Sequence, residues 1–192
     1  CIISGIRPQI AQTIVHLGLD GKVMVSTLPG LSRGQPFPYD DGLRRARRTG
    51  LQMLIVPVDG RPYLLVQDEV VDAQPIARVV MGFPMDQLFA NELHSMSGLD
   101  VSFLSLQNER PGTLFSTQPE ARQAAALSLL REAHPDPEPQ IQQFYGQRVL
   151  SQVLPLGNSG GGDQVRVLLQ IPLDHAVESF APLDRQFLGI AL

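Results

Sequence analysis

Short runs of apolar residues, interrupted by turn signals, divide the first half of the chain into small elements. Asp20-Gly21 and Asp59-Gly60 each separate two apolar runs, and an Asp-Gly pair in such a place predicts a β-hairpin. Between the hairpins, a segment with acidic residues at its start and arginines at its end suits the dipole of a helix. The predicted elements are a short helix over 8–15, a hairpin over 17–27, a loop over 28–38, a helix over 39–49, and strands over 51–58, 62–71 and 74–83. This order predicts a small antiparallel sheet with helices on one face.

The second half of the chain follows a similar course. Apolar positions at helical spacing predict a connecting helix over 86–97, with an apolar face made of Met85, Leu88, Phe89, Leu93 and Met96. Thr117-Gln118-Pro119-Glu120 is a capping-box pattern, which predicts a helix that continues through Arg131. The remaining predicted elements are strands over 101–106, 113–116, 144–156 and 164–171, loops over 107–112 and 134–139, a glycine-rich hairpin tip over 158–163 and a closing helix over 173–180.

Two blocks, near the middle and near the end of the chain, repeat each other. IARVVMGFPMD at 76–86 returns as VRVLLQIPLD at 165–174, with Pro84 matching Pro172 and Asp86 matching Asp174. A second pair matches LGLD and VSTLP, at 17–20 and 25–29, with SGLD and FSTQP, at 97–100 and 115–119. A repeat this long is typical of tandem domains rather than of a solenoid. We therefore predict two copies of one α+β module, over 1–84 and 85–192, each closed by a strand, a proline and a helix.

Composition narrows the class of protein only a little. The 192 residues are 43% hydrophobic, enough for one medium domain or two small ones. The net charge of −4 gives no support for nucleic-acid binding, and the single cysteine, Cys1, excludes a disulfide within the chain. No apolar run reaches the length of about 20 residues that a membrane-spanning helix needs. The apolar ending at 187–192 is nevertheless what the start of a flanking membrane helix would look like.

Six stretches of the sequence point to one family when they are taken together. They are LGLDGKVMVSTLPG, YDDGLRRARRTG, QPIARVVMGFPMD, SGLDVSFL, FSTQPEARQ and VRVLLQIPLDHAVESFAPL. They resemble the double Cache sensor family, which forms the extracytoplasmic halves of bacterial transmembrane receptors. The likeness is strongest to members found ahead of diguanylate cyclase (GGDEF) and cyclic-di-GMP phosphodiesterase (EAL) domains. The resemblance implies two PAS-like modules in the periplasm, placed between two membrane helices and acting as a homodimer.

In PAS-like modules, a ligand lies between the curved sheet and the loop and helix that cover it. Here the cover would be 28–49 and the facing strands 51–68. The resemblance thus implies these polar candidates for a ligand site: Tyr39, Arg44, Tyr63, Gln67 and Asp68. Strand alternation places Tyr63 and Gln67 on one face and Asp68 on the other, and we favour the first pair. The alternative is that Tyr63 is ordinary sheet packing and that Gln67 faces solvent.

The densest charge in the chain is the run from Arg44 to Arg48. It would suit an anionic ligand or lipid headgroups, but a solvated helix face paired with Asp40 and Asp41 is the preferred interpretation. Amino-acid-binding Cache domains commonly use a tryptophan. This chain has none, so an amino-acid ligand is not supported.

The second module and the remaining chemistry give weaker signals. Four polar residues are candidates for a pocket in the second module: Ser102, Ser116, Tyr145 and Arg148. A packed module without a ligand is the preferred alternative. No metal or cofactor is expected, because the four histidines are scattered and have no cysteine partner. No catalytic residue is expected either, because the chain has no Gly-x-Ser-x-Gly elbow and its glycine-rich stretch lacks the lysine of a phosphate loop.

Together these observations predict the signal-input domain of a periplasmic receptor that binds a small molecule or a periplasmic protein. Binding would shift an exit helix that carries Phe180, Leu183 and Phe187, and so regulate a cytoplasmic diguanylate cyclase or phosphodiesterase. The alternative is a protein-binding or structural spacer module without a small ligand. A sensor should have a closed, partly polar pocket, whereas the modules of a spacer should be filled with side chains.

Overall fold

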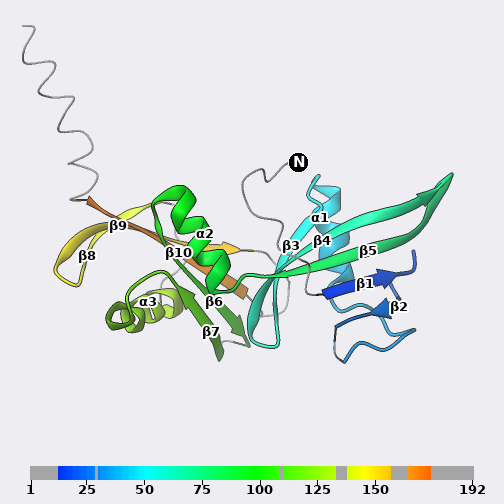
Figure 1. The fold of residues 1–192 in the computed structure, drawn as a ribbon, viewed down its shortest axis with the longest axis horizontal. Helices are drawn as coiled ribbons and strands as arrows, with labels where there is room; N and C mark the ends of the chain where they lie inside the picture. Colours follow the sequence, from blue (N-terminus) through cyan, green and yellow to red (C-terminus); the bar gives the residue numbers. More distant parts are fainter. Residues whose placement is uncertain (1–12, 29, 109, 133–137, 157–163, 174–192) are drawn as a thin grey trace, which may run out of the picture.

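Two antiparallel sheets lie end to end along the long axis of the molecule (Figure 1). The structure is a computed structural model, and it describes residues 13–28, 30–108, 110–132, 138–156 and 164–173. Each sheet has five strands, in the order β2-β1-β5-β4-β3 in the first and β7-β6-β10-β9-β8 in the second. The second order is the first with every strand moved on by five places. The expected fold class, two tandem α+β modules built on antiparallel sheets, is therefore confirmed.

The first module contains the expected helix over 39–49 and the expected strands, although β1 ends where the expected hairpin over 17–27 begins. Its elements are β1 (Thr13–Leu17), β2 (Val23–Ser26), α1 (Asp40–Arg48), β3 (Met53–Val58), β4 (Arg61–Asp72) and β5 (Gln74–Pro84). Asp20-Gly21 and Asp59-Gly60 lie in the β1–β2 and β3–β4 turns, as predicted. The expected helix over 8–15 is wrong for its described part, Thr13 to Val15, because β1 pairs with both β2 and β5 there. Sheet pairing on both sides satisfies its backbone groups better than one isolated helical turn would.

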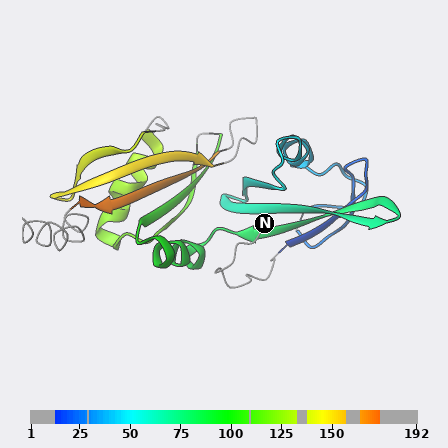
Figure 2. The same ribbon diagram turned by 90° about the horizontal axis from the view of Figure 1, so that it is seen from above.

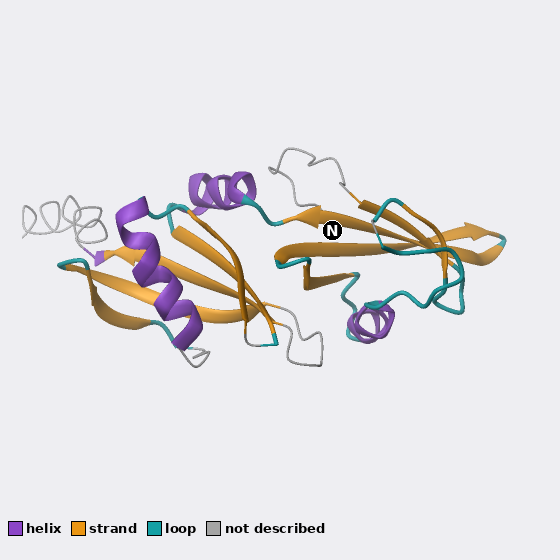
Figure 3. Ribbon diagram, turned by 90° about the horizontal axis from the view of Figure 1, so that it is seen from below, coloured by secondary structure: helices purple, strands orange, loops and turns teal. Residues whose placement is uncertain are grey.

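The second module repeats this order. Its elements are β6 (Asp100–Gln107), β7 (Arg110–Ser116), α3 (Glu120–Glu132), β8 (Gln140–Phe144), β9 (Gln147–Leu156) and β10 (Gln164–Pro172). The expected single strand over 144–156 is wrong, because Tyr145 and Gly146 have φ values of 50° and 77° and reverse the chain between β8 and β9. The expected loop over 107–112 is also too long, since β7 already begins at Arg110. Figure 3 shows α3 lying across the second sheet.

Helix α2 (Gln87–Ser97) connects the two modules. The Asp86 carboxylate accepts hydrogen bonds from the backbone N–H groups of Leu88 and Phe89, at 3.0 and 3.2 Å, and so caps the first turn. Its predicted apolar face is only partly right. Phe89 and Leu93 pack toward the second sheet, but Leu88 and Met96 are 59% and 58% exposed, because a single stripe of this short helix meets β6 and β7.

The Ser-Thr pairs of the proposed repeat perform the same task in both modules. Thr27 follows β2. Its hydroxyl accepts a hydrogen bond from the N–H group of Ile14, in β1, and its own N–H group donates to the Ile14 carbonyl oxygen. Thr117 follows β7 and bonds Val101, in β6, in the same way. The match between LGLD and SGLD is wrong, however, because 17–20 follows the first strand of its module whereas 97–100 precedes it. Two segments are equivalent only if they occupy the same position relative to the strands of their modules, and a similar local sequence does not ensure this.

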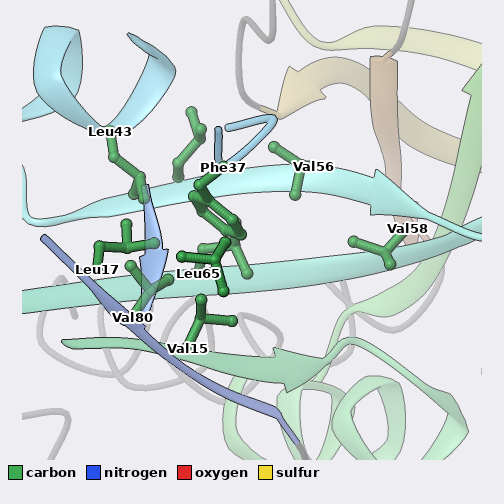
Figure 4. Packing of buried hydrophobic residues seen from close by; sticks show 10 residues of the cluster. Val15, Leu17, Phe37, Leu43, Val56, Val58, Leu65 and Val80 are labelled. Atoms are coloured by element: carbon green, nitrogen blue, oxygen red, sulfur yellow. The ribbon is translucent and has the colours of Figure 1, made fainter. Parts of the chain in front are cut away.

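The space between the first sheet and its cover is filled by apolar side chains. Phe37 and Leu43, from the cover, pack against Val56, Leu65 and Val80 of the strands (Figure 4). All of them are at most 4% exposed. The closed, partly polar pocket expected of a sensor is therefore not located at the centre of this module, where these side chains meet.

The β3–β4 turn joins the first module to the second. The Gly60 carbonyl oxygen accepts hydrogen bonds from the Ser105 hydroxyl and from the Thr113 N–H group. A Cβ added at Gly112, in β7, would overlap that carbonyl oxygen, so glycine is needed for the close approach of the β3–β4 turn to β7. Ile55 and Leu64, on the outer face of the first sheet, pack into the apolar cluster that surrounds Phe103. The two modules thus meet through both polar and apolar contacts.

Candidate functional site

Helix α1 lies over one face of the first sheet (Figure 2). It presents three arginines along one side. Asp40 and Asp41 occupy its first turn, and basic residues occupy its last turn, as the helix dipole favours. Gly42 lets the helix sit close to β3, because an added Cβ would come within 2.6 Å of Leu54 Cδ2. Positions three and four apart share a helix face, so Arg44, Arg47 and Arg48 point the same way. They form the helical wall of a surface hollow.

Arg78 forms the floor of this hollow. It lies on β5 with only 5% of its side chain exposed, and its Nη2 atom is 2.6 Å from Asp40 Oδ1. The other oxygen of Asp40 accepts a hydrogen bond from Arg44 Nε at 2.7 Å. Arg44 Nη2 also donates to the Leu19 carbonyl oxygen, at 2.7 Å, and so ties the helix to the β1–β2 turn. A buried guanidinium needs such a partner, so Asp40 fixes the position of both arginines.

Strand β4, the neighbour of β5 in the sheet, supplies the acceptors that line the hollow. The Gln67 side chain is 4% exposed, and its Nε2 atom donates to the Leu43 carbonyl oxygen at 3.2 Å. Its Oε1 atom is buried and has no hydrogen-bond partner among the described residues. Two residues further on, Glu69 forms an ion pair with Arg47. The Arg47 hydrogen bond holds the pKa of Glu69 below its usual range, and Glu69 in turn raises the pKa of Arg47.

The hollow has a volume of about 400 Å³, which falls within the range of small-ligand sites. It is open to solvent on one side. Its walls are formed by Leu19, Arg44, Arg47, Arg48, Gln67, Glu69 and Arg78. Four guanidinium groups therefore face one carboxylate. We call this feature the arginine hollow.

The sequence-predicted residues separate into two groups. Arg44 and Gln67 line the arginine hollow, so the interpretation of Gln67 as solvent-facing is wrong. Tyr39 and Tyr63 pack against the core instead, and the Tyr39 hydroxyl donates to the Pro57 carbonyl oxygen at 2.9 Å. Asp68 is exposed and borders a smaller recess, of about 50 Å³. The expected ligand pair of Tyr63 and Gln67 is thus divided between the core and the hollow.

Sequence reasoning missed Arg78 and Glu69. The sequence pattern nevertheless indicated both residues. Glu69 shares the strand face of Gln67 by alternation, and Arg78 is the single charge within the apolar run of β5. Arg78 and Glu69 are also direct partners in the β4–β5 ladder. The preferred pairing of the helix arginines with Asp40 is right for Arg44, but Arg47 uses Glu69.

The second-module candidates lie in two separate places. The Ser102 and Ser116 hydroxyls are buried and 2.7 Å apart. The Gln118 backbone N–H group donates to the Ser116 hydroxyl, and the Gln118 side-chain Nε2 atom donates to Gln170 Oε1 at 3.1 Å. Tyr145 and Arg148 lie exposed at the β8–β9 turn. Phe180, Leu183 and Phe187, expected in the exit helix, lie outside the described residues.

A larger surface hollow, of about 640 Å³, lies beside the junction of the two modules. It is lined by Asp59, Gly60, Gln107, Asn108, Arg110, Pro111 and Gly112. These residues lie in or next to the β3–β4 and β6–β7 turns, and none of them is buried. The arginine hollow combines a buried guanidinium with a buried amide, and it is therefore the better candidate for a specific site.

Within the described ranges, no helix has the length and apolar character needed to cross a membrane. In the same part of the chain, no group of three or more histidine, cysteine or acidic side chains is placed to hold a metal ion.

Comparison with known proteins gives structural likenesses only. No protein-family model matches the sequence, and no curated protein matches it. The ligand-binding domain of the Pseudomonas fluorescens chemoreceptor CtaA, in complex with L-isoleucine, has 11% identity and a TM-score of 0.49, over 88% of this chain and 72% of that one. The ligand-binding domain of Pseudomonas aeruginosa PctB, in complex with L-Arg, has 13% identity and a TM-score of 0.43, over 91% and 71%. The ligand-binding domain of the Campylobacter jejuni chemoreceptor Tlp3, in complex with 4-methylisoleucine, has 11% identity and a TM-score of 0.40. The match covers 85% of this chain and 66% of that one.

Proposed function

We propose that this chain is the extracytoplasmic signal-input domain of a bacterial membrane receptor, and that the arginine hollow binds a small ligand. The observation that carries the proposal concerns Gln67, which lines a hollow of about 400 Å³ and whose buried Oε1 atom lacks a partner among the described residues. A buried acceptor without a partner costs about 1–3 kcal/mol, which a bound donor would recover. The tandem α+β modules and the sequence blocks that resemble double Cache domains agree with a sensor.

Strand β4 offers a route from the hollow to the second module. It carries Gln67 and Glu69 in its second half and begins just after the Gly60 turn. The Gly60 carbonyl is held by Ser105 and Thr113 of the second module. A ligand that draws α1 toward β4 favours one placement of this turn over another. Differential affinity for two such placements is the only way in which binding can shift the equilibrium.

The wider receptor follows from the sequence resemblance. In this proposal residues 1–84 and 85–192 are the two modules, the receptor is a homodimer in the inner membrane, and the chain faces the periplasm. The exit segment with Phe180, Leu183 and Phe187 passes the displacement to a cytoplasmic diguanylate cyclase or phosphodiesterase. Replacing Leu183 and Phe187 with alanine in the full-length receptor should uncouple ligand from output. An unchanged response would exclude this route.

A thermal-shift screen of the chain tests whether the hollow binds ligands. The panel contains carboxylates, phosphates, amino acids, polyamines, nucleobases and sugars. A ligand at a hundred times its Kd adds about 2.7 kcal/mol to the free energy of unfolding, which raises the melting temperature by several degrees. The rise should disappear in Arg48→Ala, which changes an exposed wall residue, and persist in Arg45→Ala, on the same helix but outside the hollow.

A protein-binding or spacer module is the second candidate, and the filled interior of the first module favours it. The same screen separates the two functions. If no compound raises the melting temperature, or if the shift survives Arg48→Ala, the arginine hollow is not a ligand site. Capture of a periplasmic partner by the wild-type chain, unaffected by Arg48→Ala, would then support the second candidate.

A further inference from the structure

We infer that the ligand of the arginine hollow is a small dianion that carries a hydroxyl group, with its charge on carboxylates or on a phosphate. This inference rests on the proposed function and adds the chemical class of the ligand. It joins two observations on the lining of the hollow: an excess of guanidinium groups on α1 and β5, and an unsatisfied acceptor on β4.

The charge of the ligand follows from the partners of the four arginines. Asp40 holds both Arg78 and Arg44, and Glu69 holds Arg47. Arg48 has no hydrogen bond or ion pair with any described residue. Four guanidinium groups and two carboxylates leave an excess of two positive charges around a space of about 400 Å³. Two negative charges on the ligand would neutralise this excess.

The shape of the guanidinium group sets the kind of anion. Arginine presents N–H donors in a planar fork that matches the two oxygens of a carboxylate or of a phosphate. Arg44, Arg47 and Arg48 stand on one face of a rigid helix, and Arg78 lies below them. A ligand with two negative charges, on two carboxylates or on one phosphate, can therefore pair with more than one of these guanidinium groups.

The acceptor on β4 requires a donor on the ligand. Gln67 Oε1 is buried, and the neighbouring Glu69 is another acceptor on the same wall. An anion with acceptor atoms alone would leave Gln67 Oε1 unsatisfied and would lie beside a carboxylate of like charge. A hydroxyl group directed toward Gln67 satisfies that atom, so a hydroxylated dianion is preferred over its deoxy analogue.

Calorimetric titration of the wild-type chain with matched probes tests both features. The carboxylate probes are malate, succinate and the monoamide and diamide of succinic acid, and the phosphate probe is glycerol 3-phosphate. We expect malate or glycerol 3-phosphate to bind, and the stronger of the two to identify the anionic group. Loss of each ionic contact should weaken binding by about tenfold to a hundredfold, so the monoamide should bind more weakly than succinate and the diamide not at all.

Two variants assign the contacts. Arg48→Gln should weaken every dianion about tenfold or more, whereas the matched control Arg45→Gln should leave the affinities unchanged. Gln67→Met removes the acceptor while keeping an unbranched side chain. It should abolish the preference for malate over succinate and preserve the affinity for succinate. If Gln67→Met instead weakens both equally, the hydroxyl contact is wrong.

The two proposals fail in different ways. If a cationic or neutral compound binds and its affinity is lost in Arg48→Gln, the arginine hollow is a ligand site but the dianion is wrong. If dianions bind equally well to wild type and Arg48→Gln, the inference is also wrong, because binding then occurs elsewhere. If no class of compound binds, both the inference and the proposed site are overturned.

Discussion

Removing Asp40 should cost the first module more stability than removing its buried partner, Arg78. The two side chains form one ion pair at 2.6 Å, but their surroundings differ. Arg78 has 5% of its side chain exposed, and Asp40 has 14%. Asp40 also keeps a second partner, Arg44, at 2.7 Å. The structure therefore predicts an asymmetry that a simple count of ion pairs would not.

The magnitudes follow from what each change leaves behind. Asp40→Ala leaves the Arg78 guanidinium buried without its partner, and such a loss costs about 3–5 kcal/mol. We expect the lower end, about 3 kcal/mol, because Glu69 is the ladder neighbour of Arg78 and offers another carboxylate. Arg78→Met keeps the apolar stem and leaves Asp40 paired with Arg44, so about 1 kcal/mol is expected.

Urea denaturation of the wild-type chain, three single variants and one double variant measures the asymmetry. Asp41→Ala is the matched control, because Asp41 shares the first turn of α1 but is exposed, and its loss should cost about 0.5 kcal/mol through the helix dipole. Combining Asp40→Ala with Arg78→Met should be less destabilising than Asp40→Ala alone. Equal losses for Asp40→Ala and Asp41→Ala would refute this account of the buried pair.

Three further predictions concern the junction, the hollow and the second module. Gly112→Ala should destabilise the chain by about 2 kcal/mol, since the added Cβ meets the Gly60 carbonyl oxygen, and a fall in melting temperature of about 4–8 °C would show it. The lowered pKa of Glu69 means that its ion pair adds stability above the unfolded value of 4.5, and that this stability is lost as the pH falls through the folded value. The urea-midpoint advantage of wild type over Glu69→Gln should thus shrink as the pH falls below the unfolded value, and a constant advantage would contradict it. Gln170→Leu should cost about 1–3 kcal/mol in urea denaturation by leaving Gln118 Nε2 with one partner fewer, whereas a neutral result would show that this hydrogen bond is dispensable.

The elements that the sequence predicted correctly are those with a local chemical cause. Asp59 and Gly60 both adopt positive φ, as a tight hairpin turn requires, so this hairpin could be predicted from the Asp-Gly pair alone. Asp86 is likewise the N-cap of α2, and the residues next to it in the sequence are enough to predict this role. Tyr145-Gly146 has the same backbone conformation, but tyrosine is not a usual turn residue, so the β8–β9 hairpin was missed.

The candidate site was predicted only in part because its contacts join distant segments. Arg78 meets Asp40 only after β5 is placed beside β4 and α1 is packed across the sheet. Strand alternation placed Gln67 with Tyr63, which is right for the face. It could not tell which of them would meet the core and which the hollow, because that depends on how far α1 extends along β4.

The strand order also has a consequence for biosynthesis. In each sheet the last strand to leave the ribosome lies in the middle, with β5 between β1 and β4, and β10 between β6 and β9. The first strand of each module, β1 or β6, therefore lacks its central partner strand until synthesis has reached Pro84 or Pro172. Nascent chains that stop short of either proline expose an unpaired strand edge, which is a template for aggregation. The first module can complete its sheet while the second is still being translated, so the β3–β4 turn is already in place when β6 and β7 emerge to receive it.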